Sequence, residues 1–190
     1  MNYGQILKAD TANGLGIRLV FFVSGCTNNC KNCFQPQTHD FNYGLPYTIE
    51  TENQIIKELS KPYYDGITIM GGEPLELKNQ ETVMQLILRI REELPDKNIW
   101  LFTGSIYDEN LLPGQSRHMG DITETILNNV DVLVDGPFIP EKQNLCIDYR
   151  GSENQRLIDL KETRKQNKNV LQTDNTTLNL KKTYKLRPIC

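Results

Sequence analysis

Four short runs of β-branched and aromatic residues recur along the chain, and patterns typical of amphipathic helices lie between them. The runs that we expect to be strands are Ile17–Val23, Ile67–Met70, Ile99–Phe102 and Val130–Val134. Strands that alternate with helices at spacings of about thirty residues are typical of parallel βα units joined by right-handed crossovers. The alternation therefore predicts an α/β fold, either as an open doubly wound sheet or as a partial barrel.

The helical patterns carry signals for where each helix begins or ends. Thr51 and Gln54 are spaced as a capping box at the start of the first pattern. The second pattern repeats its apolar residues with helical period until Pro95, which is expected to end it. Asp121 and Glu124 are placed to cap the start of the third. We therefore expect three helices between the strands.

Each predicted strand is followed by a loop rich in glycine or in chemically unusual residues. These loops are Ser24–Phe34, Gly71–Pro74, Thr103–Ser105 and Asp135–Phe138. Parallel α/β proteins build their sites at the edge of the sheet where the strands end. The four loops are therefore expected to form one site.

The first loop contains three cysteines, Cys26, Cys30 and Cys33, in the spacing C-x3-C-x2-C. Three close thiolates without a fourth nearby suit a [4Fe–4S] cubane that is bound through three irons and keeps the fourth open to a ligand. The alternative is structural zinc, with His39 or Cys146 as the fourth ligand. Because zinc sites more often pair C-x2-C elements, the spacing favours the cluster.

The other three loops offer contacts for a bound cofactor. Two residues without a Cβ, Gly71 and Gly72, let a ligand lie against the backbone, and Glu73 adds a carboxylate that could hold an ammonium group. Thr103 and Asp135 each precede a glycine and could bind a ribose or a carboxylate. Taken alone, each of these loops is explained at least as well by an ordinary turn, and it is the position of the Gly71–Pro74 loop after the strand that follows the cysteine loop that favours a site.

Charge and hydropathy exclude several classes of partner. The net charge is −3, and the last 32 residues hold eight Lys and Arg against three Asp and Glu, so the body of the chain is acidic. An acidic body argues against nucleic-acid binding. Because no signal peptide or apolar run long enough to cross a bilayer is evident, we expect a cytoplasmic protein that binds no membrane.

The remaining titratable and thiol side chains are predicted to have no role in the site. His39 and His118 are expected on the surface, because no partner is evident for either. Cys146 and Cys190 are interpreted as isolated thiols. Beyond Asp148 the strand and helix patterns weaken, and only an alternation within residues 178–186 suggests another strand.

Several motifs occur together in the order found in one known family. They are Asn13–Arg18, Phe22–Cys26, the cysteine loop, Gly71–Leu75, Asp131–Phe138 and Arg150–Gln155. With these motifs the chain resembles the activating proteins of anaerobic ribonucleoside-triphosphate reductase, which belong to the radical S-adenosylmethionine (SAM) superfamily. The resemblance covers most of the chain, and it implies a partial, open TIM-like barrel over residues 1–158, followed by a basic polar tail at 159–190 that could pack on it.

The resemblance also implies a function. Cys26, Cys30 and Cys33 would hold a [4Fe–4S] cluster that cleaves SAM reductively, and the resulting 5′-deoxyadenosyl radical would take a hydrogen from a glycine of the reductase large subunit. A low-potential donor such as flavodoxin would supply the electron. The chemistry would belong to the cofactors, while the protein positions SAM and excludes water and oxygen.

The resemblance assigns a part of SAM to each loop residue. Phe34 would pack on the adenine, with backbone groups of Asn32 and Cys33 beside it. The methionine end would lie against the loop that contains Gly71, Gly72 and Glu73. Thr103 and Asp135 would contact the ribose or the carboxylate.

Two other functions compete with this one. The same chemistry could serve a different glycyl-radical enzyme or a small-molecule substrate. A protein of another class, a non-catalytic zinc or iron–sulfur binding module, would use only the cysteines.

Overall fold

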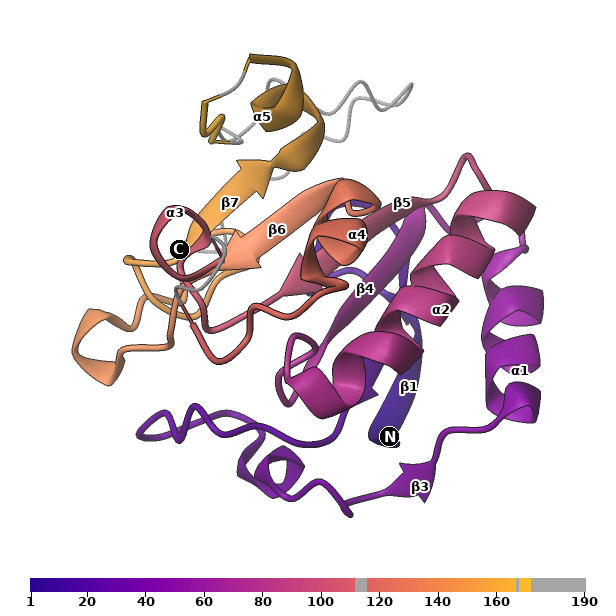
Figure 1. Ribbon diagram of the computed structural model, residues 1–190, viewed down its shortest axis with the longest axis horizontal. Helices are drawn as coiled ribbons and strands as arrows, with labels where there is room; N and C mark the ends of the chain where they lie inside the picture. The colour runs from indigo at the N-terminus through magenta and orange to yellow at the C-terminus, as the bar shows by residue number, and fades with distance from the viewer. Residues whose placement is uncertain (112–115, 167, 172–190) are drawn as a thin grey trace.

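The computed structural model of the protein describes residues 1–111, 116–166 and 168–171. A seven-stranded open sheet runs through the molecule in the order β3-β1-β2-β4-β5-β6-β7 (Figure 1). Its strands are β1 (Asn2–Asp10), β2 (Arg18–Val23), β3 (Leu45–Pro46), β4 (Gly66–Gly71), β5 (Asn98–Phe102), β6 (Val132–Asp135) and β7 (Arg156–Asp159). The α/β class is confirmed, and the sheet does not close into a barrel.

The centre of the sheet is parallel, as the alternation predicts. Strands β2, β4, β5 and β6 are parallel neighbours, with Phe21 opposite Ile69 and Ile69 opposite Leu101. Because crossover helices and loops cover both faces, these strands are buried at nearly every position and therefore read as continuous apolar runs. All four predicted strands are confirmed.

The strands at the edges run antiparallel to their neighbours and were not predicted. β1 pairs with β2, β3 pairs with β1, and β7 pairs with β6, all in antiparallel register. Every position of β1 is at least partly exposed, and β7 is only four residues long. Neither strand therefore has the apolar run that marks the central strands. These additions extend the sheet on both sides of its parallel centre.

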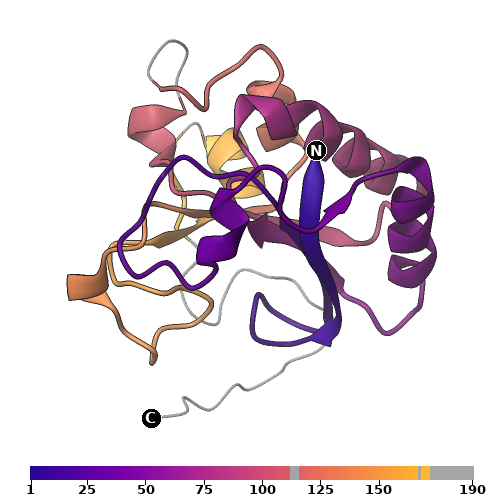
Figure 2. The same ribbon diagram turned by 90° about the horizontal axis from the view of Figure 1, so that it is seen from below.

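The longer helices pack on one face of the sheet (Figures 1 and 2). The helices are η1 (Pro36–His39), α1 (Ile49–Leu59), α2 (Leu77–Glu93), α3 (Tyr107–Asn110), α4 (Thr123–Asn128), η2 (Pro140–Lys142) and α5 (Leu160–Gln166). Leu59 of α1, Ile87 of α2 and Ile126 of α4 are fully buried in one core with strand residues such as Phe21 and Leu133. None of the helices in the described residues has the length and apolarity to cross a membrane.

The helix starts differ from those predicted. Thr48, and not the expected box of Thr51 and Gln54, caps α1, because its hydroxyl oxygen accepts from the backbone N–H of Thr51. The helix therefore begins three residues earlier than the sequence pattern suggested. At α4 the cap position is Ile122, and no side chain caps the helix there, so Asp121 and Glu124 do not have the predicted role.

The opposite face of the sheet carries a second apolar cluster, and a buried arginine lies against it. Arg18 is fully buried and donates to the Thr68 hydroxyl at 2.6 Å and to the Ile67 carbonyl at 2.6 Å. Its guanidinium lies 5.1 Å from the centre of the Trp100 ring. Burial lowers the pKa of Arg18 to about 9, although Asp65 opposes the shift.

The first part of the basic tail packs on the sheet. Helix α5 buries Leu160 and Thr163, and the N–H of Asp159 donates to the carbonyl of Val170 at 2.9 Å. We retain the division into a domain at 1–158 and a tail at 159–190 as a proposal. The strand suggested within residues 178–186, like Cys190, lies outside the described residues.

Candidate functional site

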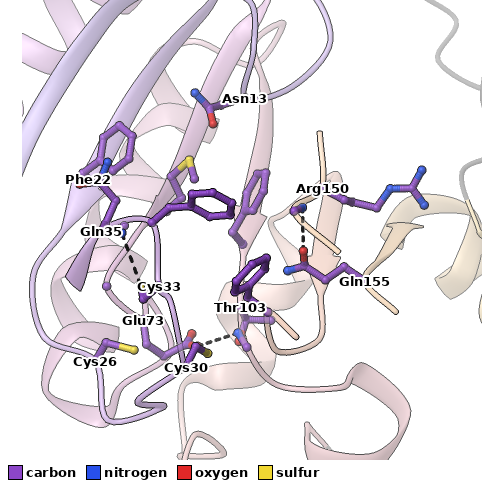
Figure 3. A pocket seen from close by; sticks show the side chains of 18 of the residues that line it. Asn13, Phe22, Cys26, Cys30, Cys33, Gln35, Glu73, Thr103, Arg150 and Gln155 are labelled. Carbon is purple, nitrogen blue, oxygen red and sulfur yellow. Dashed lines mark hydrogen bonds between the residues drawn. The ribbon is translucent and has the colours of Figure 1, made fainter. Parts of the chain in front are cut away.

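A cavity of about 570 Å³ lies at the edge of the sheet where β2, β4 and β5 end (Figure 3). A volume of this size suits a cofactor or other small-molecule ligand. The predicted site residues that line it are Cys26, Cys30, Cys33, Phe34, Gly71, Gly72, Glu73 and Thr103. The structure therefore brings eight of the ten predicted site residues to one cavity, with the three cysteines at the end where Glu73 lies.

The three cysteines are free thiols, and each is partly buried. Burial raises the pKa of Cys26 to about 12 and also raises the pKa of Cys30. For Cys26 and Cys30 the neutral thiol is therefore favoured until a metal group binds and displaces the proton. Among the described residues, no set of three His, Cys, Asp or Glu side chains surrounds a point that would suit one metal ion.

The residues present fit an iron–sulfur cluster with an open iron. Three thiols face one cavity from a single short loop, which supplies the soft ligands that iron–sulfur clusters use. Two residues without a Cβ, Gly71 and Gly72, line the same cavity. Room therefore remains in the same cavity for a second group next to the thiols.

Strained backbone positions and hydrogen bonds hold the cysteine loop in place. Gly25 precedes the first cysteine with a φ of +95°, and a Cβ there would lie 2.2 Å from the Phe41 ring. Asn29 and Asn32 have φ values of +48° and +56°, in a region that asparagine tolerates better than most residues. The N–H of Glu73 donates to the Gly25 carbonyl at 2.9 Å, which joins the first two loops of the site.

Glu73 is a buried carboxylate at the floor of the cavity, with only 1% of its surface exposed. Its Oε2 accepts from the backbone N–H of Gly104 and from the side-chain amide of Asn28, both at 2.8 Å. Its Oε1 accepts from the N–H of Leu75 at 3.0 Å. A carboxylate offers about four acceptor positions. Glu73 therefore joins three loops and keeps acceptor capacity for a cation in the cavity.

Two predicted site residues do not line the cavity. Asn32 is exposed, and Asp135 is fully buried behind the wall that Gly136 forms. The carboxylate of Asp135 accepts a bidentate pair of hydrogen bonds from Arg156 and a bond from the N–H of Tyr107 at 2.8 Å. Asp135 therefore reaches the cavity only through its neighbour Gly136.

The sequence did not reveal the positions of three polar residues beside the cysteine loop, of which His118 and Asn79 are buried and His39 is partly buried. His118, which was predicted on the surface, is 3% exposed, because Ser105 and Glu76 pack against its ring. His39 is partly buried and lines the cavity. Asn79, on α2, donates to the carbonyls of Ser24 and Glu73 at 3.0 Å. No sequence spacing marks these contacts, since each joins residues more than five positions apart.

Known proteins similar to this chain agree in their description. A family model described as "4Fe-4S single cluster domain" matches residues 12–158. The chain is 39% identical over 157 residues to the anaerobic ribonucleoside-triphosphate reductase-activating protein of Vibrio cholerae, which covers 82% of this chain and 96% of that protein. Proteins of the same name from Haemophilus influenzae and Escherichia coli K12 are 40% and 36% identical over the same shares. The chain belongs to this family of activating proteins.

The region shared with the activating-protein family contains nearly the whole cavity. All lining residues except Gln5 and Leu7 fall within the matched residues 12–158. The cysteine loop, the loop after β4 and the loop after β5 all belong to that region. The family relationship and the cavity therefore concern the same part of the molecule.

Gly72 offers a test of how tightly the first two loops of this activating-protein family member pack. A Cβ at Gly72 would lie 2.5 Å from the carbonyl oxygen of Gly25, which is backbone and cannot move aside easily. We expect Gly72→Ala to destabilise the protein by about 1–3 kcal/mol, as overpacking does, and to lower its iron content after reconstitution. Thermal unfolding and iron analysis measure both effects.

A matched glycine provides the control. At Gly4 an added Cβ would meet side chains and no backbone: the partly exposed ring of Tyr43 at 3.0 Å and the methyl group of Thr38 at 3.7 Å. Gly4→Ala should therefore keep the iron content of the wild type. Equal iron contents in the two variants would mean that the packing of Gly72 on Gly25 does not support the site.

Proposed function

We propose that this protein activates an anaerobic ribonucleoside-triphosphate reductase by reductive cleavage of SAM at a [4Fe–4S] cluster. The observation that carries the proposal is the meeting of Cys26, Cys30 and Cys33 with the carboxylate of Glu73 in one cavity. The names of the relatives, which are activating proteins of this reductase, support the same function. The open sheet would serve as the partial barrel of the radical SAM type.

The chain's own residues would bind and orient SAM. Glu73 would accept from the ammonium of the methionine end, while Gly71 and Gly72 let that end lie against the backbone. Phe34 is 59% exposed and packs on Phe138 with ring centres 4.9 Å apart, so it offers an aromatic face to the adenine.

The other predicted contacts are supporting ones in this proposal. Thr103 lines the cavity and would bind the ribose or the carboxylate of SAM. Asn32 and Cys33 would offer backbone groups near the adenine. Asp135 would act indirectly, because its pair with Arg156 fixes the chain just before Gly136.

The cofactors would supply the chemistry. Held by Cys26, Cys30 and Cys33, a [4Fe–4S] cluster would supply the electron for reductive cleavage of SAM to methionine and a 5′-deoxyadenosyl radical, and that radical would take a hydrogen atom from a glycine of the reductase. The protein would hold SAM in place and keep water from the cavity. We propose that the large subunit of the reductase is the protein substrate and that a low-potential donor such as flavodoxin supplies the electron, in the cytoplasm.

The cleavage step can be tested without the reductase. Anaerobically reconstituted protein with dithionite and SAM should release methionine and 5′-deoxyadenosine in equal amounts, measured by chromatography. Omitting the reductant should stop both products, because the cleavage consumes an electron. A reconstituted protein that holds iron and sulfide but releases neither product would contradict the proposal.

A further inference from the structure

Glu76 is a buried carboxylate that contacts the cysteine loop from outside the cavity. It is 8% exposed, and its Oε1 accepts from the Thr27 backbone N–H at 2.7 Å and from the Thr27 hydroxyl at 2.6 Å. Thr27 lies between the first and second cysteines. Glu76 does not line the cavity, so its carboxylate contacts the cysteine loop from behind.

Glu76 lies at the start of a helix, yet its carboxylate does not cap that helix. Glu76 occupies the N-cap of α2, where an acidic side chain often accepts from the first turn of its own helix. Here no side-chain cap bond forms. The carboxylate bonds to Thr27 instead, while its backbone carbonyl accepts from Asn79 and Gln80. The helix thus holds the backbone of Glu76 in place, while its carboxylate, which is not used in capping, bonds to the cysteine loop.

A second layer of side chains supports the carboxylate. The Nδ1 atom of His118 lies 2.7 Å from the hydroxyl of Ser105. Its Nε2 atom accepts from the Arg117 guanidinium at 3.2 Å and lies 3.4 Å from the Oε1 atom of Glu76. Arg117 also donates to the side-chain oxygen of Asn28 at 2.7 Å. The segment before α4 therefore contacts both Glu76 and the cysteine loop.

The carboxylate is ionised at neutral pH despite its burial. Burial raises the pKa of Glu76, but the two hydrogen bonds from Thr27 and the neighbouring His118 outweigh that effect and hold the pKa below its usual value. A buried charge is costly unless hydrogen bonds satisfy it. Glu76 thus places a fixed negative charge behind the loop that carries the three thiols.

We propose that Glu76 is a positioning residue for the cluster: it fixes the loop between Cys26 and Cys30 through Thr27, and its charge makes the bound cluster harder to reduce. The inference rests on the proposed cluster site. Two hydrogen bonds donated by Thr27 to one charged acceptor restrain the loop that must present its thiols. A negative charge close to a cluster disfavours the added electron, and few screening waters reach a buried group.

Two substitutions separate the two effects. Glu76→Gln keeps an acceptor oxygen for Thr27 but removes the charge, so iron should be retained as in the wild type while the midpoint potential of the cluster becomes more positive. Glu76→Ala removes both bonds, and a chelator should then extract iron about tenfold faster, as expected for the loss of charge-assisted hydrogen bonds. Glu81→Ala, on an exposed position of the same helix, should change neither quantity.

A further measurement uses the protein without cluster, SAM or reductase. In the iron-free chain, the rate of alkylation of Cys26 by iodoacetamide, followed by peptide mass spectrometry, should rise several-fold in Glu76→Ala and remain unchanged in Glu81→Ala. Thr27→Val, which keeps the N–H and loses the hydroxyl, should give an intermediate rate and so provides the test if Glu76→Ala does not fold.

The outcomes distinguish this inference from the proposed function. Wild-type rates of iron release and alkylation in the Glu76→Ala and Thr27→Val variants would overturn the positioning role. An unchanged midpoint potential in Glu76→Gln would overturn the effect of the charge. None of these three measurements depends on SAM cleavage or on a reductase. Failure to activate the reductase would therefore contradict the proposed function without changing the conclusion about Glu76.

Discussion

Alanine at Cys26, Cys30 or Cys33 is expected to abolish the brown chromophore of the reconstituted protein and the cleavage of SAM together. Each thiolate would ligate one iron of the cluster, and alanine offers no replacement ligand. The three thiols line one cavity from one loop, so the loss of any one leaves a cluster with two ligands. Iron and sulfide analysis, visible absorption and product chromatography on each variant measure the result.

Cys146→Ala is the matched control, because it changes a cysteine outside the cysteine loop; Cys146 is disulfide-bonded, and not the isolated thiol that the sequence suggested. Cys146 is exposed, and it does not line the cavity. This variant should keep both the chromophore and the cleavage of SAM. Loss of the cluster in Cys146→Ala would show that a fourth cysteine takes part and would favour the zinc-type or four-cysteine site that the sequence left open.

Glu73→Gln is expected to weaken the binding of SAM by about 10–100-fold while iron content stays at the level of the wild type. A hydrogen bond to a charged group contributes about 1.5–3 kcal/mol, and a factor of ten corresponds to about 1.4 kcal/mol. Glutamine keeps the shape of the side chain and one acceptor oxygen. Anaerobic equilibrium dialysis with labelled SAM measures the affinity.

Glutamine is the better choice than alanine because Glu73 also supports the site. Alanine would leave the N–H groups of Gly104 and Leu75 and the amide of Asn28 without their acceptor, which would disturb the cysteine loop as well as the SAM contact. Glu81→Gln repeats the charge change at an exposed position. If Glu73→Gln binds SAM as tightly as the wild type does, the carboxylate does not hold the ammonium.

The apolar pattern predicted the parts of the fold that are buried on both faces. Each of the four central strands contains a short, mainly apolar run, such as Leu19–Val23, so its position could be predicted from the sequence. The edge strands could not be predicted, because pairing with a neighbouring strand, and not an apolar sequence, defines them. The two residues of β3 are exposed and form a strand only by bonding to β1. A two-residue strand leaves no periodic signal in a sequence.

The loops of the site could be predicted because the rule that places them is topological. Parallel strands end at one edge, so the loops that contain Cys26, Gly72 and Thr103 had to be close in space. Contacts within the site follow no such rule. The pairing of Asp135 with Arg156 depends on β7 lying beside β6, a strand that the sequence did not reveal.

The same limit explains the misplaced histidine. Apart from Met119, the sequence neighbours of His118 are polar or small, and no partner for its ring is evident, which made a surface position the reasonable expectation. Its burial arises because the chain after β5 folds back onto the start of α2, where Gln80 donates to the His118 carbonyl at 2.7 Å. Such a contact between residues 38 positions apart is visible only in three dimensions.

Electron paramagnetic resonance of the protein mixed with its proposed substrate tests the central claim most directly. The reconstituted protein, SAM, dithionite and the large subunit of an anaerobic ribonucleoside-triphosphate reductase are incubated without oxygen and frozen. The account predicts a glycyl-radical signal on the reductase that disappears when SAM is omitted or when Cys30→Ala replaces the wild type. Cleavage of SAM without any radical on the reductase would contradict it.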